Sequence, residues 1–159
     1  MTEPSVTLLD PAPLAVLELW GDPKPAATRI AKALGHALPA AGRWEGAALR
    51  LSPTTWLIEG ETAALAGTLG EGGALTEVGG GYARVRIVGA GWRALLMESA
   101  LFDAESANFA PGCVATTLIE HITVTLKVES ADACLALVPA SHARDLIDLW
   151  QRVRVLVSA

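Results

Sequence analysis

The sequence predicts an α+β domain: a plait-like antiparallel or mixed sheet with helices packed on one face. Two observations lead to this prediction. Three segments share one plan, a strand followed by a short turn and a helix; they are residues 56–65, 85–95 and 135–147. Hairpin-like strand patterns lie between these segments, and a purely parallel sheet has no hairpins.

The central segment, residues 82–96, shows the plan most clearly. Apolar and polar residues largely alternate along 83–88, the period-two pattern of a half-buried strand. A helical stripe follows at spacings i, i+3, i+4 and i+7, and it consists of Trp92, Leu95, Leu96 and Ser99. We therefore predict a strand, a glycine turn and a helix.

The chain before this segment begins with a polar, proline-bearing stretch, residues 1–13, which predicts a loose N-terminal arm. We expect a single domain over 14–159. Its first half is predicted to contain a strand over 14–20, a helix from Pro25 to about Leu34, a hairpin of 47–51 with 56–59, a helix over 61–69 and a brief strand over 75–78.

The chain after the central segment begins with a predicted loop over 102–112, which has no clean period. Residues 113–128 are strand-like but too long for one strand, so we expect a bend or bulge near Glu120–His121. A last strand over 134–138 and a last helix capped by Ser141 follow. The helix stripe consists of Leu146, Leu149, Trp150, Val153 and Val157.

Charge and cysteine content exclude several classes of function. Seventeen acidic residues against twelve Lys and Arg give a net charge of −5, which argues against nucleic acid and anionic membranes as partners. No apolar run reaches the ~18 residues of a membrane span, and the N-terminus lacks a signal-peptide pattern. Cys113 and Cys134 have no metal-binding spacing. We expect reduced thiols and a cytoplasmic location.

The apolar fraction is high for a chain of this size. Apolar residues make up 52% of the sequence, charged residues only 18%, and the mean hydropathy is +0.40. Two explanations stand side by side: an alanine-rich composition, or apolar surface that a partner covers.

One motif resembles a nucleotide-binding turn. Gly89-Ala-Gly91-Trp-Arg-Ala94 follows a strand and opens a helix, as in dinucleotide-binding folds. The following residues do not form the second strand that such a fold requires. We therefore interpret the glycines as a tight connection that needs positive φ.

No catalytic residue or metal site is predicted. His36, His121 and His142 are scattered, with no ligand at metal-binding spacing. The two cysteines lack a neighbouring base, so both are interpreted as buried apolar residues.

Four residues are candidates for contact with a partner. Arg84, Arg86 and Arg93 could form one basic spot for a carboxylate or a partner, although a solvated strand face explains them equally well. Trp44 lies in a predicted loop between two glycines and is expected to be exposed at a contact. The other four tryptophans, including Trp20, are predicted to lie in the core.

An ordered set of motifs is similar to a known family. The segment 109–126 contains Phe-x-Pro-Gly, a cysteine and then Thr-x-Leu-x-x-His, and it resembles the gamma subunit of heterotetrameric sarcosine oxidase. Three other stretches agree with the same family in the same order; they are Leu51–Ile58, Val85–Leu96 and Leu137–Ser141.

This resemblance implies a fold related to the folate-binding domain of aminomethyltransferases. It also implies a non-catalytic accessory subunit of an oxidoreductase complex that oxidatively demethylates sarcosine or a related N-methyl amine. Larger flavin-bearing subunits would be the partners and would hold FAD, FMN, NAD and tetrahydrofolate, with no cofactor on this chain.

Two alternatives remain open. The first is a stand-alone folate-binding protein with its pocket near the central glycine turn. The acidic pair that relatives use near that pocket has no counterpart here, since Gly46–Arg50 contains no acid. The second alternative is a homo-oligomer of this chain.

Overall fold

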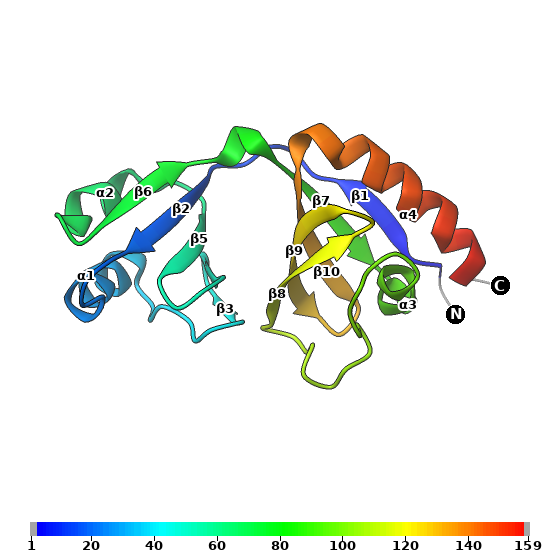
Figure 1. Cartoon of the computed structure of the whole chain (residues 1–159), viewed down its shortest axis with the longest axis horizontal. Helices are drawn as coiled ribbons and strands as arrows, with labels where there is room; N and C mark the ends of the chain where they lie inside the picture. Colours follow the sequence, from blue (N-terminus) through cyan, green and yellow to red (C-terminus); the bar gives the residue numbers. More distant parts are fainter. Residues whose placement is uncertain (1–2, 158–159) are drawn as a thin grey trace. The chain divides into compact units, whose positions relative to one another are not determined.

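The computed structural model describes residues 3–157, and their contacts fall into two compact units. The first unit combines the chain up to Pro11 with the chain from Gly80 onward, and the second unit comprises Ala12–Gly79 (Figure 1). The sequence predicted one domain over 14–159. The second unit is inserted in the chain between the first strand of the first unit and the remainder of that unit.

The second unit is an antiparallel sheet with two helices on one face. Its strand order is β3 (Trp44–Glu45), β4 (Ala48–Arg50), β5 (Thr55–Glu59), β2 (Leu14–Leu19) and β6 (Gly73–Glu77). The helices are α1 (Lys24–Leu34) and α2 (Ala63–Leu69). Buried apolar residues of both helices pack against β2, β4 and β5, because alternate strand residues point to that face.

The first unit repeats this architecture with a different set of strands. Its strand order is β1 (Ser5–Leu8), β7 (Tyr82–Val88), β10 (Ala133–Pro139), β9 (Ile122–Ser130) and β8 (Val114–Ile119), all antiparallel. The helices are α3 (Trp92–Met97) and α4 (Ala143–Val157). Two short 3-10 turns, η1 (Gly79–Gly81) and η2 (Ala140–His142), precede β7 and α4.

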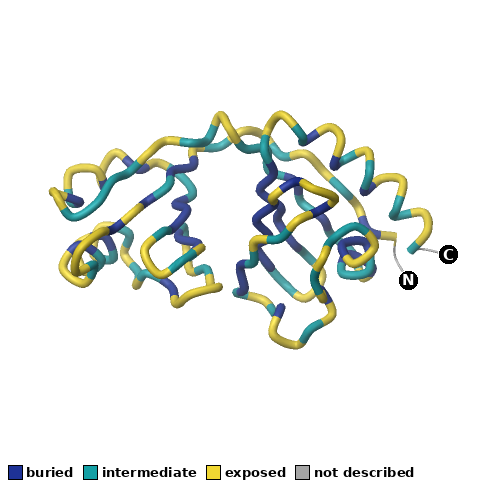
Figure 2. Tube along the Cα trace, in the orientation of Figure 1, coloured by how far each residue is buried: buried dark blue, intermediate teal, exposed yellow. Residues whose placement is uncertain are grey.

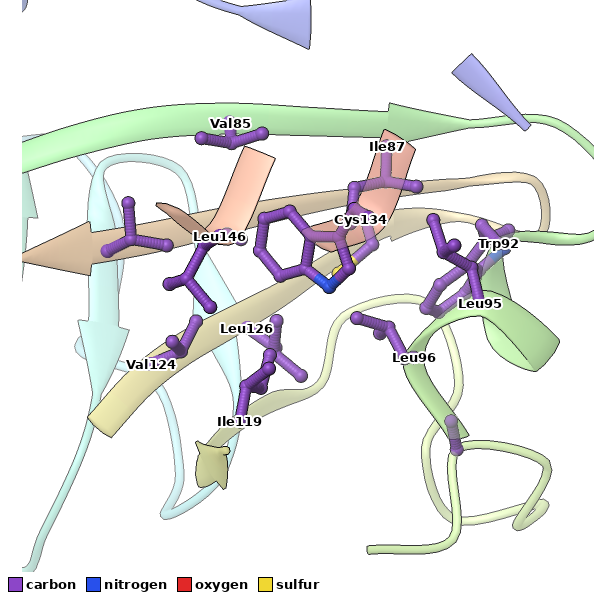
Figure 3. Close-up of a cluster of buried hydrophobic side chains, with 14 of the residues drawn as sticks. Val85, Ile87, Trp92, Leu95, Leu96, Ile119, Val124, Leu126, Cys134 and Leu146 are labelled. Atoms are coloured by element: carbon purple, nitrogen blue, oxygen red, sulfur yellow. The ribbon is translucent and has the colours of Figure 1, made fainter. Parts of the chain in front are cut away.

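The core of the first unit lies between its sheet and its helices. Figure 3 shows strand residues such as Val85, Ile87 and Leu126 in one cluster with Trp92 of α3 and Leu146 of α4. Buried residues run along β9 and β10, whereas α4 alternates between buried and exposed positions (Figure 2). This alternation is that of an amphipathic helix with one face on the sheet.

The α+β class, the antiparallel sheets and the placement of helices on one sheet face are confirmed. Each of the three predicted repeats is a strand followed by a helix: β5–α2, β7–α3 and β10–α4. The hairpin of β4 with β5 is confirmed as well. The strands form two sheets, because β6 pairs with β2 and β7 pairs with β1 and β10.

Two local predictions are wrong. The loose arm over 1–13 contains a strand, because Ser5–Leu8 pair in register with Val88–Val85 of β7; Met1 and Thr2 lie outside the described residues. The bend expected near Glu120–His121 is a complete chain reversal, because Ile119 pairs with Ile122 and makes β8 and β9 a hairpin. Glu120 reaches the reversal with a φ of +57°.

Candidate functional site

The glycine turn between β7 and α3 is filled by the chain's own N-terminal segment. Gly89 has a φ of +122°, and a Cβ there would lie 3.1 Å from Pro4 Cα and 3.2 Å from the Glu3 carbonyl oxygen. Gly91 has a φ of −90°, and a Cβ there would lie 3.3 Å from Pro4 Cδ. Positive φ therefore explains only Gly89, and close packing against Pro4 explains Gly91. Glu3 and Pro4 occupy the space beside the two glycines that a bound phosphate would need.

Arg84 and Arg86 lie on the sheet face opposite the core of the first unit, because Val85 and Ile87, which alternate with them, point into that core. The Arg86 guanidinium is paired: its Nε donates to Glu129 Oε2 at 2.9 Å, and its Nη2 donates to Glu129 Oε1 at 3.0 Å. A bidentate pair of this kind neutralises most of the charge that Arg86 would offer to a ligand.

Arg93 lies on the other side of the same sheet, on α3. Its guanidinium carbon is 4.4 Å from the ring centroid of Trp92 and 5.7 Å from that of Phe109. It also donates from Nη1 to the carbonyl oxygen of Ala104. Arg93 thus fastens the 98–113 loop to α3, and the structure does not gather it with Arg84 and Arg86 into one basic spot.

Trp44 lies in the two-residue strand β3, opposite Leu49, and is partly exposed. The tryptophan that is most exposed is Trp20, which the sequence placed in the core. Trp20 follows Leu19, which points into the core of the second unit, so the alternation of the strand directs Trp20 to the opposite face, as it does Glu18. The indole N–H of Trp20 donates to the carbonyl of Glu71 at 2.9 Å.

Two of the three histidines line one hollow, although no sequence pattern indicates that they lie close together. His121 and His142 line a hollow of about 440 Å³ beside the β8–β9 reversal and α4, together with Asp145 and Arg152. His36 belongs to the second unit, where its Nε2 accepts a hydrogen bond from the Ala47 amide at 3.4 Å. Within residues 3–157, no three His, Cys, Asp or Glu side chains form a group suited to a metal ion.

Both cysteines are buried and free of disulfides. Cys113 Sγ donates to the carbonyl oxygen of Asn108 at 2.8 Å. Burial, with a smaller contribution from the charge of Glu129, raises the pKa of Cys134 to about 12. A thiol in that state is a poor nucleophile, because the thiolate is the reactive form.

The surface that sequence reasoning missed surrounds the end of α3. We define the acidic apolar edge as seven residues: the apolar Met97, Leu101 and Leu118, and the acidic Glu98, Asp103, Glu105 and Glu120, all exposed. One signal was available in the sequence, because residues 94–126 contain four acids and no Lys or Arg. No other stretch of the first unit is as long without a Lys or Arg.

Within the described residues, no helix is long and apolar enough to cross a membrane. The fold is that of an α+β protein with two antiparallel sheets, each carrying helices on one face. No family model matches the chain, and no curated protein matches its sequence.

The same fold occurs in a solved structure of heterotetrameric sarcosine oxidase from Corynebacterium sp. U-96 in complex with pyrrole 2-carboxylate. One of its chains superposes with a TM-score of 0.89 and 20% sequence identity, over 100% of this chain and 88% of that chain. The likeness in fold is to the same enzyme complex as the resemblance in sequence. The regulatory subunit of aspartate kinase from Thermus flavus gives a TM-score of 0.45 at 15% identity, over 95% of this chain and 96% of that chain, too low to indicate a shared fold.

Proposed function

We propose that this chain is a non-catalytic accessory subunit of a sarcosine-oxidase-like complex, which oxidatively demethylates sarcosine or a related N-methyl amine. The observation that carries the proposal is the likeness in fold over the whole chain, which also covers 88% of a chain from a heterotetrameric enzyme. The matched chain belongs to a heterotetrameric enzyme, which supports a subunit role in an assembly of that kind.

The chemistry of the described residues supports an accessory role. The pKa of the Cys134 thiol is raised to about 12, and the guanidinium of Arg86 is paired with Glu129. The glycine turn, where the folate-binding alternative places its pocket, packs against Glu3 and Pro4. In this proposal the larger subunits hold the flavins, NAD and tetrahydrofolate, and this chain contributes to assembly and stability.

Isolation of the tagged chain from its native cell tests the proposal. The tag belongs at the C-terminus, because Pro4 packs against the glycine turn near the N-terminus. We expect larger partners at fixed stoichiometry, identified by mass spectrometry, and flavin absorbance in the eluate. A chain that is recovered alone and colourless would overturn the proposal.

A second measurement separates the folate-binding alternative. The isolated chain is titrated with a reduced folate while its tryptophan fluorescence is recorded. Saturable binding to the isolated chain, together with no recovered partner, would favour the stand-alone folate-binding protein. We expect no binding.

A further inference from the structure

The acidic apolar edge exposes large apolar side chains in one place. Leu101 is 79% exposed, Met97 45% and Leu118 42%. Single exposed apolar residues are ordinary on a protein surface, but neighbouring ones indicate a contact site.

Backbone pairing places Leu101 and Leu118 side by side. Ala100 forms an antiparallel bridge with Ile119, and the Leu101 amide donates to the Leu118 carbonyl at 3.2 Å. Residues that face each other in this way have Cβ atoms about 5 Å apart on the same side of the strands. Leu101 and Leu118 therefore form one continuous apolar surface.

The four charged residues of the acidic apolar edge all have the same sign, although Arg152 of α4 lines the hollow beside Glu120. Glu98, Asp103 and Glu105 lie within four residues of Leu101, and Glu120 is joined to the same segment, because its amide donates to the Ser99 carbonyl at 3.2 Å. The nearest cation along the chain, Arg93, is engaged by the rings of Trp92 and Phe109 and by Ala104. A matching surface would be apolar at its centre and positively charged at its rim.

The segment that carries Leu101 is held in place before any partner arrives. The Phe102 and Phe109 rings meet edge to face at 5.0 Å, and Phe109 is also within reach of Arg93. A surface that is already ordered loses little conformational entropy on binding, which favours affinity.

We propose that the acidic apolar edge docks a partner protein whose contact surface has an apolar centre and a rim of Lys or Arg. The inference rests on the proposed function, because the partner it describes is another subunit of the complex.

A pair of leucine variants tests this inference. Leu101→Asp places a charge at the centre of the edge, and Leu156→Asp makes the same change on an equally open site of the same unit, where Leu156 is 72% exposed. The readout is the affinity of each purified full-length chain for the partners that the native isolation recovers. We expect Leu101→Asp to weaken binding about 30-fold or more, as for a hot-spot residue, and Leu156→Asp to change it less than about 3-fold. Melting temperatures of both variants should match that of the wild type, since both positions are exposed.

A charge reversal tests the rim separately. The double variant Glu98→Lys with Glu105→Lys should slow association about 10-fold at low salt, and the difference should shrink at high salt, because screening weakens interactions between exposed charges. Partners that bind Leu101→Asp as tightly as wild type would overturn the docking inference and leave the proposed function standing. A wild-type chain that recovers no partner would overturn both.

Discussion

Two buried tryptophans of the first unit differ in the hydrogen bonding of the indole N–H, and a pair of substitutions can measure the effect. Trp92 and Trp150 are both at most 1% exposed and belong to the same core cluster. The indole N–H of Trp92 donates to the Ala131 carbonyl at 2.9 Å, whereas the buried Nε1 of Trp150 has no hydrogen-bond partner among residues 3–157. Trp92→Phe should therefore destabilise the protein more than Trp150→Phe.

The expected difference follows from two contributions. Phenylalanine is about 40 Å³ smaller than tryptophan, which costs about 1 kcal/mol at either site if the cavity does not collapse. Trp92→Phe also loses a hydrogen bond, a further ~1 kcal/mol. Trp150→Phe removes a buried N–H donor that no acceptor satisfies. The desolvation cost of that donor, about 1–3 kcal/mol, is therefore relieved, and this gain offsets the cost of the cavity. We expect about 2 kcal/mol for Trp92→Phe and close to zero for Trp150→Phe.

Urea denaturation followed by far-ultraviolet circular dichroism measures both values. Tryptophan fluorescence is less suitable, because each substitution removes one of the five tryptophans and so changes the signal itself. Both residues lie in the first unit, so separate unfolding of the second unit would affect the two variants equally. A Trp150→Phe protein that is destabilised as much as Trp92→Phe, or more, would refute the hydrogen-bond reasoning.

Three further predictions concern the first unit. Gly89→Ala should lower the free energy of unfolding by about 1–3 kcal/mol, because Gly89 has a φ of +122° and a Cβ there would lie 3.1 Å from Pro4 Cα. The control is Gly80→Ala, which should be near neutral because a Cβ there meets nothing within 4 Å. Thermal melts of both variants measure the difference. Cys134 keeps its proton in the folded state up to a pKa of about 12, while the unfolded thiol ionises near its ordinary value of 9.0, so stability is lost as pH rises above 9. The difference in unfolding free energy between wild type and Cys134→Ala should therefore decrease by up to about 1.4 kcal/mol per pH unit above pH 9. A difference that stays constant with pH would contradict the raised pKa of Cys134. Glu129→Gln should cost at most about 1 kcal/mol in denaturant titrations, because the Arg86–Glu129 pair is partly exposed; a loss of several kcal/mol would mean that the pair acts as a buried one.

Residue periodicity was sufficient to predict most elements of this fold. The predictions of β9 from its alternation and of α4 from its apolar stripe were correct, because one side of each element packs on a core. An element that buries one side has apolar residues at the regular spacing of its secondary structure. β1 was missed because it is a short edge strand in which no residue is fully buried. Its alternation of Ser5 and Thr7 with Val6 and Leu8 was the available signal.

The division of the strands into two sheets could not be predicted from periodicity. β6 and β7 are neighbours in the chain, yet they join different sheets, and an alternating pattern does not specify which strand pairs with which. The contact of Arg93 with Phe109 could not be predicted either, because it depends on the path of the 98–113 loop, which has no periodic pattern. The acidic apolar edge was within reach of the sequence through its one-signed charge, but only the structure places Leu118 opposite Leu101.

The chain order of β1 has a consequence for protein synthesis. Ser5 pairs with Val88, 83 positions later, so β1 leaves the ribosome long before its partner strand exists. At about 5–20 residues per second, this delay lasts about 4–17 s. All strands of the inserted second unit are made within that interval, so it can acquire its own core while β1 is still an open edge. Pro4 before β1, and Pro11 and Pro13 beyond it, bracket this waiting strand with residues that resist pairing with the wrong partner.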